Sequence, residues 1–359
     1  MKTLPSFVKR CTKNYSRNTV GYFLILNMEK GKLKQNLIIF GIDKLLRAIN
    51  RTPRVLFYHG VDHVNESSSL HIAPKKFEQE IKFLSHHYEV IDLDEYFERF
   101  RQNKFSNREI VITFDDGYRN NLTHAAPILQ AFNLPFTVFV SAGHIESGKR
   151  FPTAIARTVI LSHMVDTIEI ECIRFKSPLA DDRQRKHVYG LISHTLKHSN
   201  IDLVNEICKE LIENLPAGAY QEFCARHTAD DPLNWEEVKK LQTDYKCIIG
   251  AHCLDHFICN GYQTREQTRR QLIDSKRLIE EKTNSACHYM AYPNGIVHEG
   301  DVSDNALEAV AEAGYRLAFT TENDRLLPGN NPYLMPRHSA RFEMNDFIMK
   351  LALKPKLKI

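Results

Sequence analysis

Residues 110–120 read IVITFDDGYRN, an apolar run of strand-forming residues that stops at two adjacent aspartates and a glycine. The run Ile110–Phe114 predicts a strand, because β-branched and aromatic residues favour that conformation. Asp115 and Asp116 repel each other, so their place at a strand end needs an explanation. They form either an ordinary acidic turn or half of a metal site, in which one carboxylate binds a cation and the other moves a proton.

The chain around this strand alternates short strand-like runs with amphipathic helical stretches from about Arg54 onward. This alternation predicts an α/β fold with a parallel sheet, and the number of units predicts a barrel. In such barrels the active site lies at the C-terminal ends of the strands, where the two aspartates fall. Strands are expected at 55–58, 89–91, 110–114, 136–140, 246–250, 288–291, 317–320 and 333–337, and helices at 76–86, 235–242, 265–282 and 303–313.

Residues 144–232 depart from this alternation of strands and helices, because they are mostly polar and typical of helices. We interpret them as a helical insertion within the barrel, which is either a lid over the site or an elaboration without a catalytic part. The predicted organisation is a basic N-terminal arm over 1–51, a barrel over 52–350 and the insertion at 144–232. The sequence contains no internal repeat and no low-complexity tract.

The composition is that of a soluble globular protein, with 43% hydrophobic and 26% charged residues among 359. No run approaches the ~20 apolar residues of a membrane-spanning helix. The run Val20–Met28 is too short, follows a basic stretch and lacks a small-residue cleavage site, so a secretory signal is not expected. The 8 cysteines are scattered without a CxxC pair, which favours a reducing compartment.

The charge is concentrated at the N-terminus. Residues 1–51 hold 11 Lys or Arg against 2 acidic residues, a net charge of +9, so within a chain of net charge +4 the remainder carries −5. A basic arm indicates contact with a polyanion, and anionic lipid is one candidate. The apolar residues of 37–49 fall near one helical face, which fits either a membrane-surface helix or a helix packed on the barrel exterior. We expect a cytoplasmic protein, peripheral to the inner membrane, and no nucleic-acid partner, because no recognition motif accompanies the charge.

A second informative stretch is KCIIGAHCLDHFICN at 246–260, in which His252 and His256 follow a probable strand. At positions i and i+4 two histidines share one face of a helical turn, an arrangement that suits two imidazoles bound to one metal. Together with Asp116 they would form a three-ligand catalytic zinc set with an open position for water. Asp115 would then be free to act as general base.

Two further strand ends carry candidate residues. The stretch YMAYPNG at 289–295 ends in a Pro-Asn-Gly turn, whose backbone N–H groups could serve as oxyanion donors. In RVLFYHGV at 54–61, His59 follows the first strand. A lone histidine there is usually structural, but its place at the same barrel face makes it a candidate for proton transfer.

Together these stretches resemble the polysaccharide deacetylase family of metal-dependent carbohydrate esterases. The resemblance covers roughly 54–140 and 233–350 and implies the distorted (β/α) barrel of that family. The matching motifs are TFDDG at 113–117, HCLDH at 252–256, YPNG at 292–295 as a variant of the family's RxPYG, and FYHGV at 57–61, which is similar to the YHxV opening of one bacterial branch.

The resemblance implies a role for each matching residue. The family's base corresponds to Asp115, its metal ligands to Asp116, His252 and His256, its oxyanion-binding N–H to Asn294, and the acid of the YHxV branch to His59.

Two departures from the family pattern qualify these roles. The family arginine that pairs with the base is Ala291 in this chain. We hypothesise that Arg337, within MPRHSARF, reaches Asp115 instead. Its neighbour His338 is a second candidate for the acid role, although a structural histidine is the expected interpretation.

The function implied is hydrolysis of an N-acetyl group from an amino sugar in a polysaccharide, oligosaccharide or glycolipid precursor. The implied cofactor is a divalent metal, with zinc first and cobalt, nickel or iron as alternatives. Three other functions stay open: a deformylase or deacylase of a lipid-linked amino sugar, a catalytically inactive glycan-binding module, and a structural metal site with a fourth ligand such as Cys253 or Asp255. The sequence does not predict the oligomeric state.

Overall fold

The computed structural model describes residues 35, 38, 41–63, 70–340 and 343–353. The chain divides into two compact units, one formed by 52–341 with 355–359 and the other by 1–51 with 342–354. Most of the predicted basic arm, including Val20–Met28, lies outside the described residues. The domain boundaries at 51, 144, 232 and 350 stay predictions.

The larger unit is built on a parallel sheet of eight strands. Their order is β11-β10-β9-β6-β5-β1-β12, and β4, outside this order, pairs with Glu109 and Ile110 of β5. Every pair in this sheet is parallel, as the alternation of strand and helix predicts. The strands are β1 (Arg54–Tyr58), β4 (Glu89–Val90), β5 (Glu109–Phe114), β6 (Phe136–Val140), β9 (Cys247–Ala251), β10 (Tyr289–Ala291), β11 (Leu317–Phe319) and β12 (His338–Ser339).

The two ends of this strand order meet through one segment. Met335 forms an isolated bridge with Phe319 of β11, and three residues later β12 pairs with β1. The sheet therefore curls into the expected distorted barrel. The strand expected at 333–337 is wrong, since pairing as a strand begins only at His338. Pro336 has no N–H to donate to a ladder, which accounts for the interruption.

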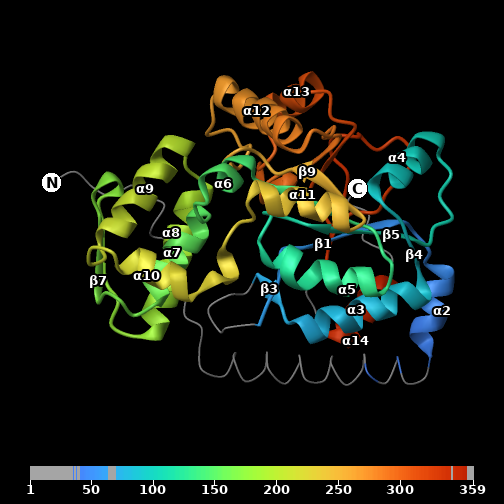
Figure 1. The fold of residues 1–359 in the computed structure, drawn as a ribbon, viewed down its shortest axis with the longest axis horizontal. Coiled ribbons are helices and arrows are strands. Elements are labelled where there is room, and N and C mark those ends of the chain that lie inside the picture. Colours follow the sequence, from blue (N-terminus) through green and yellow to red (C-terminus); the bar gives the residue numbers. More distant parts are fainter. Residues whose placement is uncertain (1–34, 36–37, 39–40, 64–69, 341–342, 354–359) are drawn as a thin grey trace. The chain divides into compact units, whose positions relative to one another are not determined.

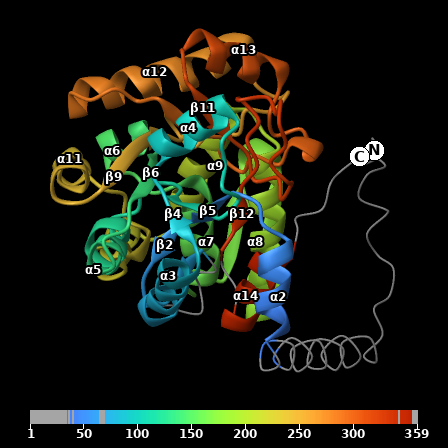
Figure 2. The ribbon, with the colours of Figure 1, turned by 90° about the vertical axis from the view of Figure 1, so that its right-hand side faces the viewer.

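Helices connect the strands and cover the outside of the sheet (Figure 2). The helices expected at 76–86, 235–242, 265–282 and 303–313 are confirmed within two residues at each end. Capping explains two of the starts, because Asn234 and Thr264 each form a capping box with the residue three positions on. The helices are α3 (Pro74–His87), α4 (Leu93–Gln102), α5 (Ala126–Ala131), α6 (Ala142–Ser147), α11 (Trp235–Asp244), α12 (Arg265–Thr283) and α13 (Asp304–Glu312), with a π-helical segment η2 (Asn121–Ala125), a 3-10 turn η5 (Val297–Glu299) and a small pair of strands, β2 (Gly60–Val61) and β3 (His71–Ile72).

The region predicted as an insertion contains four helices and a hairpin, which lie together on one side of Figure 1. The hairpin was not predicted, although the exposed and buried residues of Thr167–Ile170 alternate as in a strand. The elements are α7 (Pro152–Leu161), β7 (Thr167–Ile170), η3 (Glu171–Ile173), β8 (Phe175–Pro178), α8 (Asp182–Lys197), α9 (Ile201–Glu213), α10 (Ala219–Arg226) and η4 (Thr228–Asp230).

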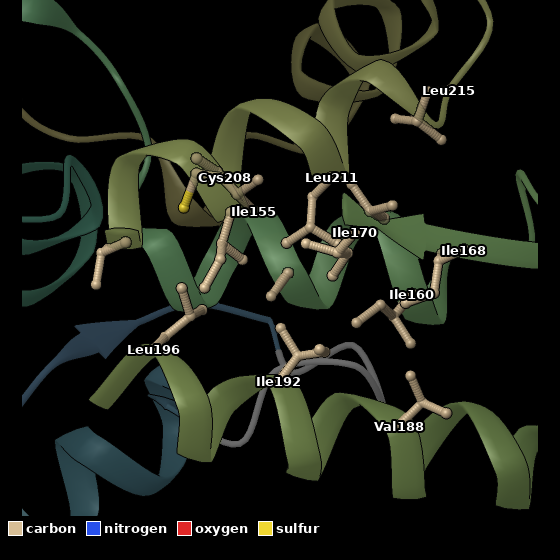
Figure 3. Packing of buried hydrophobic residues seen from close by; sticks show 14 of the residues in the cluster. Ile155, Ile160, Ile168, Ile170, Val188, Ile192, Leu196, Cys208, Leu211 and Leu215 are labelled. Atoms are coloured by element: carbon tan, nitrogen blue, oxygen red, sulfur yellow. The ribbon is translucent and has the colours of Figure 1, made fainter. Parts of the chain in front are cut away.

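These elements enclose a hydrophobic cluster of their own (Figure 3). Ile160 and Ile192 are at most 1% exposed, and Ile207 and Leu211 are fully buried. Burial of one such side chain stabilises the fold by roughly 1.5–3 kcal/mol. The region therefore has a hydrophobic core of its own.

The smaller unit pairs α2 (Ile42–Ile49) with α14 (Met344–Ala352), and Asn50 Nδ2 donates a hydrogen bond of 3.2 Å to the Ala352 carbonyl. Three apolar side chains of α2 stay exposed, Ile42 by 37%, Leu45 by 63% and Ile49 by 62%. Among the helices described, none combines the length and the apolar character that crossing a bilayer requires. The seven described cysteines form no disulfide.

Candidate metal centre and active site

The candidate residues gather where parallel strands end, as the barrel predicts. Asp115 and Asp116 directly follow β5, and the pair His252 and His256 follows β9. The cavity at this edge has a volume of about 280 Å³. Its walls include His59 after β1, Asn294 after β10, and Asp116 with His256. The structure thus brings together residues from four strand ends.

The turn after β5 sends the two aspartates to different partners. Asp116 has a φ of +75° and Gly117 a φ of +81°, both in the left-handed region. A side chain at Gly117 would place its Cβ 2.9 Å from a methyl group of Val140, so glycine is required for both backbone and space. The Asp115 carboxylate consequently meets Arg337, whereas the Asp116 carboxylate faces the two histidines.

Asp116, His252 and His256 form a possible three-residue metal centre, with ligand atoms all within 4.8 Å of one another. Asp116 Oδ1 lies 3.4 Å from His252 Nε2 and 3.2 Å from His256 Nε2. This oxygen is buried and accepts no hydrogen bond from any part of the chain that the structure describes. A buried carboxylate oxygen that faces two imidazole nitrogens fits a cation between them.

One histidine of the pair is oriented by a second contact. His252 Nδ1–H donates a hydrogen bond of 2.8 Å to the carbonyl of Ala291. Since this fixes the proton on Nδ1, Nε2 presents its lone pair toward Asp116, an arrangement usual for metal-binding histidines. The residue that departs from the family pattern therefore contributes its backbone to the centre.

The two histidines do not share a helical turn, so that expectation is wrong. The segment after β9 is an irregular turn in which Cys253 has a φ of +58° and His256 a φ of +49°. These left-handed residues bend the chain enough to bring the rings of His252 and His256 to a centroid distance of 5.1 Å. His256 also meets Phe151, from just before α7, with ring centroids 5.1 Å apart.

A fourth protein ligand is absent among the described residues, because the cluster of possible ligands contains only Asp116 and the two histidines. The Cys253 thiol is buried and lies 3.7 Å from the thiol of Cys259. Asp255 accepts a hydrogen bond of 2.7 Å from Gln271 Nε2. Three protein ligands are the number typical of catalytic zinc sites, and a metal held by them would keep a position for water or substrate.

Asp115 is held by a bidentate ion pair. Arg337 Nη1 and Nη2 lie 2.6 Å and 2.8 Å from its two carboxylate oxygens, and both side chains are buried. Burial alone would raise the pKa of Asp115, but Arg337, together with His252 and His59, holds that pKa below its usual range. The hypothesised contact of Arg337 with Asp115 is present, and its part in the reaction stays a prediction.

Asp116 is buried as well, and a cation between its carboxylate and the two imidazoles would compensate its negative charge. An ionised carboxylate is the form that binds a metal.

His338, the second candidate for the acid, is engaged by another residue, because its Nδ1 lies 2.5 Å from Asn323 Oδ1.

In the turn after β10, Asn294 has a left-handed backbone with a φ of +60°. Its side chain donates to Asp301 (2.5 Å) and accepts from Lys197 Nζ (3.0 Å), and its carbonyl accepts from Thr321 Oγ1 (2.6 Å). Its own backbone N–H donates to no residue that the structure describes. This N–H is therefore available for the oxyanion role that the resemblance implies.

Residues of the insertion that the sequence did not single out also line this cavity. Lys197 from α8 reaches Asn294, and Arg157 from α7 pairs with Asp230 at 2.5 Å. Asp230 also meets His71 of β3 at 3.0 Å, so the insertion is tied to the barrel beside the site. No motif in the sequence marks these contacts, whose partners lie more than seventy positions apart.

The chain is similar to a known protein family and to individual known proteins. The family described as "Polysaccharide deacetylase" matches residues 102–318. The chain is 20% identical over 273 residues to the poly-beta-1,6-N-acetyl-D-glucosamine N-deacetylase of Staphylococcus aureus (strain MSSA476), covering 76% of this chain and 68% of that protein.

Two solved structures share the fold. The Streptococcus pyogenes deacetylase PplD in complex with acetate superposes with a TM-score of 0.56 at 15% identity, over 84% of this chain and 98% of that one. IcaB from Ammonifex degensii superposes with a TM-score of 0.55 at 17% identity, over 84% of this chain and 97% of that one.

Proposed function

Because the chain belongs to the polysaccharide deacetylase family, we propose that this site hydrolyses the N-acetyl group of an amino sugar within a glycan. The observation that carries the proposal is the centre itself: Asp116, His252 and His256 face one point, and Asp115 lies beside them. Such an arrangement suits metal-assisted amide hydrolysis. A glycan-binding module without activity would not need a buried, ionised Asp115 held by its own arginine.

The relative from Staphylococcus aureus acts, by its name, on poly-beta-1,6-N-acetyl-D-glucosamine. We therefore propose a glycan of N-acetylglucosamine as the substrate.

We propose zinc as the resident ion, with cobalt or nickel as substitutes. Two imidazoles and one carboxylate are a usual zinc set, and the same ligands also accept the other two metals. Asp116 Oδ1, His252 Nε2 and His256 Nε2 would hold it. Bound there, the ion would supply Lewis-acid polarisation of the amide carbonyl and activation of a water molecule.

The residues around the ion divide the remaining work. Asp115 accepts the proton of the attacking water, and Arg337 fixes the orientation of its carboxylate. The N–H of Asn294 donates to the oxyanion that forms at the amide carbonyl. His59, which also lines the cavity, donates a proton to the departing amine.

The test is acetate release from β-1,6-linked N-acetylglucosamine oligomers. We expect release by the purified protein, loss of release after chelation, and recovery on addition of zinc or cobalt. Failure of the metal-loaded protein to release acetate from this and from β-1,4-linked oligomers would contradict the proposal.

A second candidate, deacylation or deformylation of a lipid-linked amino sugar, is favoured by the basic N-terminus and by the exposed apolar residues of α2. We propose that this part of the chain binds the cytoplasmic face of the inner membrane, where such a precursor would be found. Release of formate instead of acetate from a glycolipid would select this alternative.

A further inference from the structure

A second cavity lies against the active-site cavity, on the side of the insertion. It has a volume of about 840 Å³, within the usual range for ligand sites. Pro152 and Asp255 contribute to the walls of both cavities. Phe151 adjoins both as well, because its ring meets His256 on the metal side and His144 on the other, with centroids 5.1 Å and 4.4 Å apart.

Two buried side chains in this second cavity have polar atoms without a partner. His144 is 8% exposed, and its Nδ1–H donates to the Lys149 carbonyl at 2.8 Å, which leaves Nε2 as a buried acceptor with no donor. Arg150 is 5% exposed and uses Nε and Nη2 on Asp231, while its Nη1 is a buried donor with no acceptor. Buried polar groups are rarely left unmatched, so both atoms are available to hydrogen-bond a polar ligand in this cavity.

The charges of the walls identify the class of that ligand. Positive and negative side chains balance, so neither a phosphate nor a metal cation is favoured. One free acceptor and one free donor suit a hydroxyl or acetamide group, which can both donate and accept, and Tyr220 adds an aromatic wall. The charged residues are Lys149, Arg150 and Lys209 against Glu213, Asp231 and Asp255.

We propose that the second cavity binds neighbouring sugars of the glycan while one N-acetylated sugar occupies the cavity at the metal centre. This inference rests on the proposed function, which supplies the polymeric substrate. The shared lining residues Pro152 and Asp255 place the second cavity directly beside the first, where the next sugars of one chain would lie. The insertion thereby makes the enzyme selective for a polymer over a single sugar.

The proposal can be tested by substituting exposed residues that line the second cavity with tryptophan, which would fill it. Gln221 on α10 and Asn205 on α9 line the cavity and are exposed, so Gln221→Trp and Asn205→Trp block it without altering a buried contact. The matched control is Glu222→Trp, the next position on α10, which is exposed and does not line the cavity.

Calorimetric binding is measured with N-acetylglucosamine and with its β-1,6- and β-1,4-linked hexasaccharides, using metal-loaded Asp115→Asn protein to prevent turnover. We expect a hexasaccharide to bind at least tenfold more tightly than the monosaccharide. Each cavity-filling change should remove that advantage and leave monosaccharide binding as it was, and the control should change neither. In the otherwise native enzyme, the same changes should raise KM for the hexasaccharide.

The proposal would be overturned if the monosaccharide and the hexasaccharide bound equally tightly, or if Gln221→Trp and Asn205→Trp both kept the tighter binding of the hexasaccharide. Either result would leave the proposed acetate release unaffected. The two proposals can also be separated in the other direction. If the hexasaccharide binds more tightly than the monosaccharide, the cavity-filling changes abolish this difference and the protein releases no acetate, the second cavity binds sugars but the proposed function is wrong.

Discussion

The two adjacent aspartates at the end of β5 have different partners and therefore different proposed roles. Asp115 is neutralised by Arg337, and Asp116 faces a pair of histidines. Their mutual repulsion is offset because each lies beside a different positive or metal-binding group. The left-handed backbone at Asp116 produces this separation, since it turns consecutive side chains toward different walls.

Replacement of the proposed base tests this division directly. Asp115→Asn should lower kcat by two to four orders of magnitude, because general-base catalysis contributes roughly that much, while the bound metal is retained. Acetate release and metal content are measured on the same sample. The exposed Asp182→Asn variant serves as control, and near-normal turnover of Asp115→Asn would assign the base elsewhere.

The arginine can be tested apart from the base. Arg337→Lys keeps a positive charge but cannot form the two parallel hydrogen bonds, so Asp115 should be misplaced and kcat should fall on the order of a hundredfold. The metal content should not change, because Arg337 touches none of the ligands. Unchanged kcat in a protein that folds normally would mean that the ion pair only stabilises the barrel.

At the scale of elements, the strands that carry the site were predictable and the geometry of the turns after them was not. Apolar runs that stop at polar residues revealed β1, β5, β6 and β9 within one residue at each end. The left-handed turn that unites His252 and His256 depends on tertiary packing and looks like an ordinary HxxxH helix in sequence. Arg337 could only be guessed, because it follows an interrupted strand and its partner lies 222 positions away.

The junction of the insertion with the barrel should be sensitive to acid. Hydrogen bonding and charge from His71 and Arg157 outweigh burial and lower the pKa of Asp230 from 3.8 to about 2. A carboxyl whose pKa is depressed in the folded protein contributes stability above its unfolded pKa and loses it as the pH falls through the folded pKa. This contribution, about 2.5 kcal/mol at most, is therefore present above pH 4 and disappears toward pH 2.

Denaturant unfolding of the native protein and Asp230→Asn at several pH values checks this expectation. The native protein should be the more stable near neutral pH, and the difference should shrink as the pH falls below 4. A difference that stays constant over that range would contradict the ion-cluster account.

At the scale of the whole molecule, the uneven charge and the exposed side chains of α2 bear on location. Leu45 and Ile49 are more than 60% exposed, and lysines and arginines are concentrated in the first 51 residues. We expect the protein to bind vesicles containing anionic lipid, and binding should weaken with salt.

The double substitution Leu45→Ser and Ile49→Ser should reduce vesicle binding at least tenfold, since each apolar side chain contributes roughly 1.5–3 kcal/mol when buried. Acetate release from a soluble oligomer should be unaffected, because neither residue belongs to the unit that holds the site. Cosedimentation with vesicles measures the change, and unaltered binding would argue against α2 as the contact.

The most direct test of the metal centre is elemental analysis of the purified protein beside His252→Ala. The structure predicts about one divalent ion per chain in the native protein and its loss in the variant, because a three-ligand centre that loses one imidazole binds weakly. A native protein that holds no metal, even after incubation with zinc, cobalt or nickel, would contradict the assignment of Asp116, His252 and His256 as a catalytic centre.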